Sequence, residues 1–213
     1  MLALAPAASA DLAFQRSAPL SDAEAAARVH RSPWEPRPEN WRQNHRTPRA
    51  GFLKRFHRTS DMPNHAWVTG NFTGTTDEIL QWGARKWGFS ARLFRAVATV
   101  ETWWHQDFVG DEGTSYGLMQ VRVPYHCCLP VIQTSTAFNV DYYGAILRAY
   151  YDGKQDWLMD VEHGRAYRSG DLWGSLGVWA SGRWHLGTSD SYVQAVKQRL
   201  ADRVWRTADF DNG

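Results

Sequence analysis

Residues 90–121 read SARLFRAVATVETWWHQDFVGDEGTSYGLMQV, and the interpretation of the rest of the chain depends on this stretch. Ser90 is a favourable helix N-cap, and apolar residues then recur at helical spacing, at Leu93, Phe94, Val97 and Ala98. Residues 110–123 are rich first in glycine and then in residues that favour strands. The pattern predicts a helix followed by a loop or hairpin.

The other periodic segments are also helical. Thr75 can cap a helix that has acidic residues in its first turn and ends at Gly88. A third helix is predicted from the Thr-Ser pair at 134–135 to Gly153, and further helical stretches at 172–179 and 191–205. No series of alternating strands competes with them. The sequence therefore predicts a mainly α-helical domain with a small β element.

Glu101 has an unusual position in the helix that Ser90 begins. It lies three, four and seven residues after apolar positions, and so projects from the face that packs inward. Burial disfavours a charged carboxylate, which raises its pKa and keeps it protonated near neutral pH. Such an acid, next to the rings of Trp103 and Trp104, has the chemistry of a general acid for glycosidic cleavage. The alternative is a surface Glu paired with Arg92 or Arg95.

The segment GDEGTSYGLMQV at residues 110–121 resembles the Gly-Leu-Met-Gln signature of soluble lytic transglycosylases. These enzymes belong to the lysozyme superfamily and cleave the glycan strands of bacterial cell walls. In that family a helix ending in the catalytic Glu precedes the motif, and Glu101 stands in the same relation to it here. The resemblance implies a lysozyme-like α+β fold with Glu101 as the catalytic residue. It also implies substrate contacts for Ser115, Met119 and Gln120.

Two later stretches are similar to the same family. Residues 138–147, FNVDYYGAIL, resemble its long helix after the Gln motif. The sequence VWASG, which contains Trp179, stands where the family has Ala-Tyr-Asn-Ala-Gly, but Ala180 replaces the asparagine. Tyr192 matches the tyrosine that the family directs at its catalytic acid. The resemblance covers residues 76–196 and implies that Trp179 and Tyr192 also belong to the substrate site.

The activity implied by the resemblance is that of a peptidoglycan lytic transglycosylase. Glu101 would protonate the oxygen between N-acetylmuramic acid and N-acetylglucosamine, and would then take the proton of the muramoyl C6 hydroxyl to close a 1,6-anhydro ring. No cofactor is required, and neither is the second carboxylate of most glycoside hydrolases. If Asp111 or Glu112 served as a second acid, the enzyme would be a hydrolytic, goose-type lysozyme-like muramidase. The Ala180 departure favours another alternative, a non-catalytic peptidoglycan-binding module.

Composition limits the class of protein. Of 213 residues, 43% are hydrophobic and 22% are charged, so the chain is too apolar for a disordered protein. Its apolar runs are shorter than the roughly 20 residues of a membrane span. The patterns predict an N-terminal extension at 1–74, a lysozyme-like domain at 75–207 and a tail at 208–213. We expect a monomer.

The extension is strongly basic between residues 28 and 58, with nine basic residues, two acidic residues and four prolines. The prolines predict an irregular, extended backbone. One interpretation is a basic arm that binds an anionic cell-wall polymer. The other is a segment draped over the domain and anchored by Trp34, Trp41 and Phe52. A nucleic-acid binder, a third hypothesis, would make the motif around Glu101 a coincidence, and we expect no nucleic acid as partner.

The first ten residues predict the location of the protein. Residues 1–10 are mostly small and apolar and end in Ala-Ser-Ala, a pattern typical of a signal-peptidase site, although no basic region precedes it. Together with the family resemblance, this predicts a secreted protein of the cell wall or periplasm.

The cysteines, histidines and tryptophans bear on disulfides, metal sites and the aromatic core. Cys127 and Cys128 are adjacent, and a bridge between neighbours strains the backbone. The sequence therefore indicates no disulfide framework and leaves the state of these two cysteines open. The eight histidines show no zinc-binding spacing, so no metal is expected. Of the 12 tryptophans, Trp82 and Trp87 are expected in the core. Four others are candidates for a sugar-binding groove: Trp103, Trp104, Trp179 and Trp184.

Overall fold

Helices form most of the part of the chain that the computed structural model describes, which comprises residues 11–14, 18–123, 125–162 and 167–211. The predicted export pattern at 1–10 lies outside these residues. The longest helices outside the N-terminal segment are α4 (Thr76–Trp87), α5 (Ala91–Thr102), α7 (Thr136–Tyr151), α9 (Leu172–Ser181) and α10 (Thr188–Asp202). The prediction of a mainly helical chain is confirmed.

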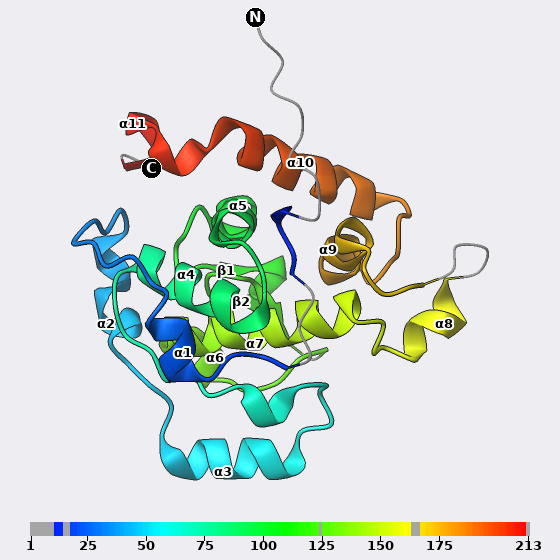
Figure 1. Ribbon diagram of the computed structural model, residues 1–213, viewed down its shortest axis with the longest axis horizontal. Coiled ribbons are helices and arrows are strands. Elements are labelled where there is room, and N and C mark those ends of the chain that lie inside the picture. The colour runs from blue at the N-terminus through cyan, green and yellow to red at the C-terminus, as the bar shows by residue number, and fades with distance from the viewer. Residues whose placement is uncertain (1–10, 15–17, 124, 163–166, 212–213) are drawn as a thin grey trace, which may run out of the picture.

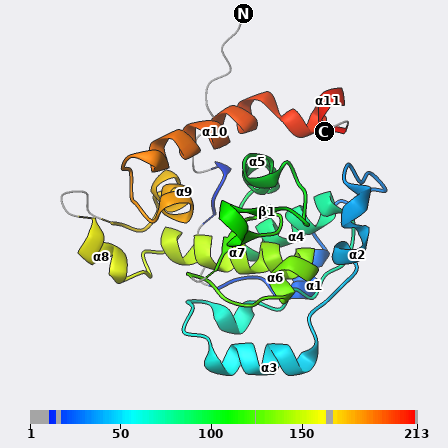
Figure 2. The same cartoon turned by 180° about the vertical axis from the view of Figure 1, so that it is seen from behind.

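Helix α7 is the centre of the fold, and all of its residues are buried. It packs against α4 and α9, while α5 lies between α4 and α10. Figures 1 and 2 show α10 crossing one end of the molecule, with α5 directly beneath it and α7 in the middle. This arrangement brings the ends of α5, α9 and α10 together at one place.

The ends of the helices follow the capping residues of the sequence. Thr75 and Glu78 form a reciprocal capping box at the start of α4, and Gly88 ends that helix with φ +75°. Ser90 caps α5 by accepting a hydrogen bond from the backbone N–H of Arg92. The predicted starts of both helices are confirmed.

Helices α4 and α7 approach each other closely because each has a glycine at the contact. Gly83 of α4 faces Val140, and Gly144 of α7 faces the ring of Trp87. A Cβ atom added at either glycine would collide with the opposite side chain. The tight contact places Trp82 and Trp87 in the core, as predicted, with exposed fractions of 0% and 1%.

A buried ion network lies beside this contact. The Nζ of Lys86 is 2.6 Å from Asp22 and 2.7 Å from Asp141. Asp141 also accepts hydrogen bonds from the backbone N–H groups of Thr69 and Gly70 and from the indole of Trp87. Since buried charges are tolerated only when they are paired and hydrogen-bonded, the network fastens the N-terminal segment to the helices.

The β element is a small antiparallel sheet in the order β1–β2–β3, as predicted. Its strands are β1 (Val109–Gly110), β2 (Ser115–Tyr116) and β3 (Val121–Arg122). Gly110 pairs with Ser115, and Ser115 pairs with Arg122. The sheet directly follows α5, so it stands next to the end of the helix that carries Glu101.

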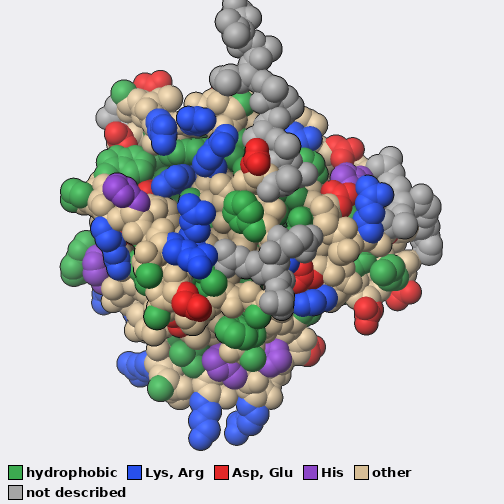
Figure 3. All heavy atoms as spheres, viewed as in Figure 1, with side chains coloured by type: hydrophobic (Ala, Val, Ile, Leu, Met, Phe, Trp, Pro, Cys, Tyr) green, Lys and Arg blue, Asp and Glu red, His purple; other side chains and the backbone are tan. Residues whose placement is uncertain are grey.

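The N-terminal segment is more regular than predicted, because its prolines lie outside its longest helix. Helix α3 (Ala50–Thr59) begins after Pro48. The other elements of the segment are short: α1 (Asp22–Ala26), η2 (Pro38–Asn40), α2 (Trp41–Asn44) and η3 (His65–Trp67). Figure 3 shows Lys and Arg side chains near α3 and in a second group higher on the same face, so basic side chains lie at more than one place on this surface.

The described part of the segment packs against the helices. Arg37 is 1% exposed and donates hydrogen bonds to the backbone carbonyls of Trp103 and Phe210. Trp34 packs against the core, as the draped-segment interpretation expects. Trp41 does not act as an anchor, because 64% of its surface is exposed.

The remaining elements are short connections. They are η4 (Asp111–Gly113), α6 (Val131–Thr134), α8 (Trp157–Val161), η5 (Val204–Arg206) and α11 (Ala208–Asp211). The predicted helix at 191–205 divides into α10 and η5 because Arg203 adopts a left-handed conformation, with φ +50°. Within the described ranges, no helix has the length and apolar character that a bilayer span requires.

Candidate active site

Glu101 lies in the last turn of α5, where the chain changes direction. Trp103 and Trp104, the two residues after the helix, both have left-handed backbone conformations, with φ +55° and +71°. This conformation is uncommon for residues other than glycine, asparagine and aspartate. The sharp turn leaves the Glu101 side chain beside α9 and α10 and leads the backbone into the small sheet.

The carboxyl of Glu101 receives two hydrogen bonds on the same oxygen. The hydroxyl of Tyr192, from α10, donates to Oε1. The indole N–H of Trp179, from α9, donates to the same atom over 3.1 Å. Within the described residues, Oε2 has no hydrogen-bond partner. The structure thus brings three of the predicted site residues together and leaves one carboxyl oxygen for a proton.

Burial raises the pKa of Glu101 to about 7. The hydrogen bonds from Tyr192 and Trp179 oppose the rise because they favour the carboxylate, while the negative charge of Asp111 adds to it. The alternative of a surface ion pair with arginine is wrong for Arg95, whose guanidinium binds Asp77 instead. Close to neutral pH, Glu101 is therefore able both to give and to take a proton.

Trp179 is held by a second layer of aromatic side chains. Its ring stacks on His126 at 5.2 Å between centroids and meets the edge of Tyr143 at 4.8 Å. His126 Nδ1 lies 3.4 Å from the hydroxyl of Tyr142. Burial lowers the pKa of His126 to about 4, so its ring is neutral at neutral pH. This layer fixes the direction of the indole N–H toward Glu101.

The hydroxyl of Tyr143 is buried near the carboxyl and has no hydrogen-bond partner among the described residues. Burial and the charge of Glu101 raise the pKa of Tyr143 well above its ordinary value, and the same two causes raise the pKa of Tyr192. Both phenols therefore keep their protons. Sequence reasoning missed His126 and Tyr143, because neither belongs to the motif and only the packing of α7 and α9 brings them to the site.

A cleft of about 830 Å³ opens beside Glu101, within the usual range of ligand sites. Aromatic side chains line it at Trp103 and Phe108, and Phe108 is 47% exposed. Arg199, from α10, lies over the ring of Trp103 and also lines the cleft. The mixture of exposed rings and polar side chains suits a ligand that has both apolar faces and hydroxyl groups.

The three hairpin residues that the family resemblance assigns to the substrate site, Ser115, Met119 and Gln120, differ in how far they are exposed. Ser115 and Met119 are 1% and 0% exposed, and neither lines the cleft. The Ser115 hydroxyl donates to Asp111 over 2.5 Å, and the backbone N–H of Met119 donates to Asn139. These two residues hold the hairpin in place. Gln120 is partly exposed, and its amide donates to the carbonyl of Gly117 over 2.9 Å, without a contact to Glu101.

The four candidate groove tryptophans divide into two pairs. Trp103 lines the cleft and Trp179 binds Glu101. The prediction is wrong for Trp104 and Trp184, which are 0% and 1% exposed and belong to the core. The sequence did not distinguish the pairs because proximity to Glu101 along the chain does not determine the direction of a ring.

The structure gives the state of the two adjacent cysteines, which the sequence left open. Cys127 and Cys128 form a disulfide in the loop that carries His126. Cys128 has a left-handed backbone conformation in this loop, with φ +92°. The disulfide is next in sequence to the ring that supports Trp179.

The comparisons with known proteins give no assignment. No protein-family model, curated protein or solved structure matches this chain. In the described parts of the chain, no group of three or more His, Cys, Asp or Glu side chains is arranged to hold a metal ion. Functional interpretation therefore rests on Glu101, its partners and the cleft.

Proposed function

We propose that this protein is a peptidoglycan lytic transglycosylase with a lysozyme-like fold. The observation that carries the proposal is the carboxyl of Glu101, whose pKa is raised to about 7 and which lies beside a cleft. In the sequence, Glu101 precedes the Gly-Leu-Met-Gln motif of the hairpin. The hydrogen bonds from Tyr192 and Trp179 support it, because they hold one carboxyl oxygen and leave the other free to carry the proton.

In the proposed reaction, Glu101 acts first as an acid. Its proton moves to the glycosidic oxygen between N-acetylmuramic acid and N-acetylglucosamine as the bond from that oxygen to C1 breaks. The acetamido oxygen of the muramic acid residue bonds to C1 and stabilises the positive charge. Tyr192 and Trp179 stabilise the carboxylate that Glu101 becomes, because both donate to Oε1.

Glu101 then acts as a base. The carboxylate takes the proton of the C6 hydroxyl, O6 attacks C1, and the bond from C1 to the acetamido oxygen breaks. The products are a 1,6-anhydro-muramoyl end and a free N-acetylglucosamine end, and no water is consumed. Glu101 regains its proton, so one residue with a pKa near 7 serves both steps.

Asp111 favours a second candidate, hydrolysis. Its negative charge contributes to the raised pKa of Glu101, so a second carboxylate lies within electrostatic reach of the first. Asp111 also accepts a hydrogen bond from Ser115 and lies 3.8 Å from Arg122. A carboxylate of this kind would activate water in a muramidase. Ala180, where the family has asparagine, favours a third candidate, a peptidoglycan-binding module without turnover.

The experiment is to incubate the purified protein with cell-wall sacculi and to identify the released ends by mass spectrometry. Anhydro ends support the transglycosylase, reducing ends support hydrolysis, and sedimentation with sacculi without release supports the binding module. Glu101→Gln should abolish release. The matched control is Asp160→Asn, the same acid-to-amide change at an exposed position on α8. Release that survives in Glu101→Gln would refute the assignment of Glu101.

The proposed substrate determines partner and location. A monomer that acts on glycan strands would work outside the cytoplasm, in the cell wall or periplasm, or as a secreted protein. Contact of the basic N-terminal segment with an anionic wall polymer is part of the same proposal. It predicts that sedimentation with sacculi weakens as salt concentration rises.

A further inference from the structure

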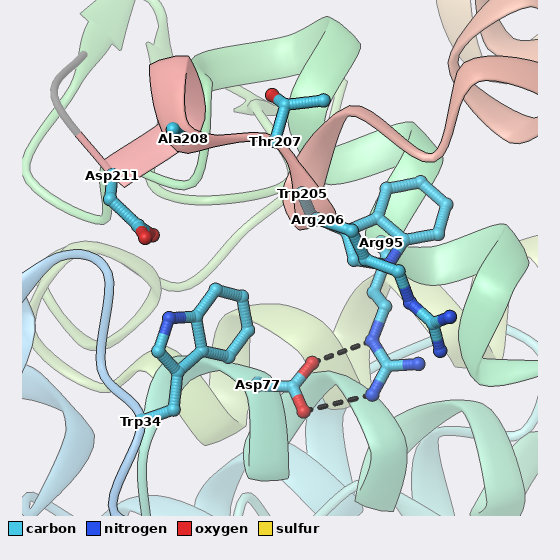
Figure 4. A pocket seen from close by; sticks show the side chains of 8 residues that line it. All are labelled: Trp34, Asp77, Arg95, Trp205, Arg206, Thr207, Ala208 and Asp211. Carbon is cyan, nitrogen blue, oxygen red and sulfur yellow. Dashed lines mark hydrogen bonds and ion pairs between the residues drawn. The ribbon is translucent and has the colours of Figure 1, made fainter.

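A second cavity, of about 560 Å³, lies at a different place from the Glu101 cleft and shares no lining residue with it. Four parts of the chain form its wall. Trp34 comes from the N-terminal segment, Asp77 from α4 and Arg95 from α5, while Arg206 and Asp211 come from the C-terminal segment. Figure 4 shows Trp34 beside the Asp77–Arg95 pair, with Arg206 and Asp211 descending from the C-terminal segment.

The base of the cavity is a rigid, neutral pair. Arg95 donates to both oxygens of Asp77, over 2.6 and 2.8 Å, and Gln81 donates to one of the same oxygens. Such a two-point pair has a fixed geometry. Arg206 and Asp211 add one positive and one negative charge, so the charges of the side chains in the wall sum to zero. A ligand with many hydroxyl groups and no net charge suits this wall better than an ion does.

Trp34 supplies the apolar surface of the cavity. Its ring is partly exposed, and its position is fixed by an edge contact with Trp104 at 5.8 Å between centroids. An aromatic face held in this way can stack on the C–H face of a pyranose ring, while the adjacent arginine and aspartate groups donate to and accept from its hydroxyls. A flat ring beside paired charged groups is therefore a surface for carbohydrate.

An aromatic wall separates the two cavities. The ring of Phe210 contacts Trp103, which lines the Glu101 cleft, at 5.2 Å between centroids. The same ring contacts Trp104, which packs on Trp34 of the second cavity, at 4.9 Å. The two sites are thus independent pockets on either side of one packed cluster of rings. A glycan bound at the second site would not occupy the position at which Glu101 acts.

We propose that the cavity formed by Trp34, Asp77, Arg95, Arg206 and Asp211 is an accessory binding site for a neutral saccharide. Its role would be to retain a strand or a product after cleavage. That role rests on the proposed function, whereas binding of the saccharide does not. The two claims are therefore tested by separate measurements.

The probe is N-acetylglucosamine tetrasaccharide, titrated into the Glu101→Gln variant of this chain so that no cleavage occurs. The readout is the set of tryptophan indole N–H signals in a ¹H,¹⁵N spectrum, with the Trp34 signal assigned by its loss in Trp34→Phe. We expect the Trp34 signal to shift in a saturable way. Arg206→Ala should weaken this response by about tenfold, the effect of losing one hydrogen bond from a charged donor.

Arg206 is exposed, so Arg206→Ala tests the site without disturbing the core, and Asp211→Asn tests the opposite side of the cavity in the same way. Arg168→Ala, at an exposed position outside both cavities and outside the basic segment, is the matched control and should leave the titration unchanged. A Trp34 signal that does not move, or a response that survives in Arg206→Ala and Asp211→Asn, would overturn the proposal. So would a Trp34 signal that responds to inorganic phosphate and not to the tetrasaccharide.

Failure of this proposal is distinguishable from failure of the proposed function. If sacculi are not cleaved but the Trp34 signal responds to tetrasaccharide, the accessory site stands and the transglycosylase assignment falls. If sacculi are cleaved and the Trp34 signal does not respond, the enzyme stands and the accessory site falls.

Discussion

Replacing Glu101 by glutamine should change how the free energy of unfolding depends on pH. Burial raises the pKa of Glu101 from 4.5 to about 7 in the folded protein. The folded state therefore holds this proton more tightly than the unfolded chain does. The resulting stabilisation is present in full below pH 4.5 and is lost as the pH rises through about 7.

The size of the effect follows from the two pKa values. Each pKa unit is equivalent to about 1.4 kcal/mol, so the wild type loses roughly 3 kcal/mol from this group between acidic and alkaline pH. Glutamine does not ionise, and its side-chain oxygen can still accept hydrogen bonds from Tyr192 and Trp179. We therefore expect the two proteins to be similar in stability near pH 4 and Glu101→Gln to be more stable above about pH 8.

The assay is urea unfolding followed by tryptophan fluorescence at several values between about pH 4 and pH 9. The difference in the free energy of unfolding between variant and wild type should grow with pH and level off above about pH 8. Asp160→Asn, at an exposed position, should follow the wild type throughout. Parallel curves for wild type and Glu101→Gln would show that the Glu101 carboxyl is not buried as described, and the argument for a general acid would lose its basis.

Three further changes test other parts of the structure. Tyr192→Phe removes a hydrogen bond that favours the carboxylate of Glu101 and so lowers its pKa. In the variant, the alkaline limb of the pH–activity profile should therefore move to higher pH, and the maximal rate should fall. An alkaline limb at the wild-type pH would contradict this. Tyr143→Phe removes a buried hydroxyl without a described partner, so the melting temperature should stay the same or rise, and a clear fall would reveal a partner. Lys86→Met leaves Asp141 buried without its cation and should cost about 3–5 kcal/mol in urea unfolding. A loss below about 1 kcal/mol, the usual worth of an exposed ion pair, would contradict the burial of this pair.

The sequence predicted those parts of the fold that depend on local rules. Capping residues and apolar periodicity are properties of neighbours along the chain, and they located the starts of α4 and α5 at Thr75 and Ser90. The N-terminal segment was harder to predict, because Arg37 and Asn40 are ordered by backbone carbonyls more than 60 residues away. Contacts at such separations leave no periodic pattern in the sequence.

The candidate site shows the same division. Apolar periodicity alone predicted that Glu101 faces inward. Trp179 and Tyr192 were predicted as site residues only from the family resemblance, because 78 and 91 residues separate them from Glu101. Tyr143 lies on a helix that is buried on all sides, so its apolar pattern gave no sign of which face meets the carboxyl. Met119 fits the motif but is fully buried, because the hairpin turns its side chain into the core.

The features around Glu101 reduce stability, and this is the strongest physical reason to regard the site as functional. A carboxyl whose pKa is raised by burial, a buried Tyr143 hydroxyl without a described partner, and left-handed backbone at Trp103 and Trp104 occur within one small region. Each has an energetic cost that a purely structural core would avoid. The paired charges at Lys86 and Asp141, by contrast, satisfy one another. Functional sites are where a chain is expected to depart from the rules that favour stability. Here three such departures occur together around Glu101, the acid that the sequence pattern had already indicated.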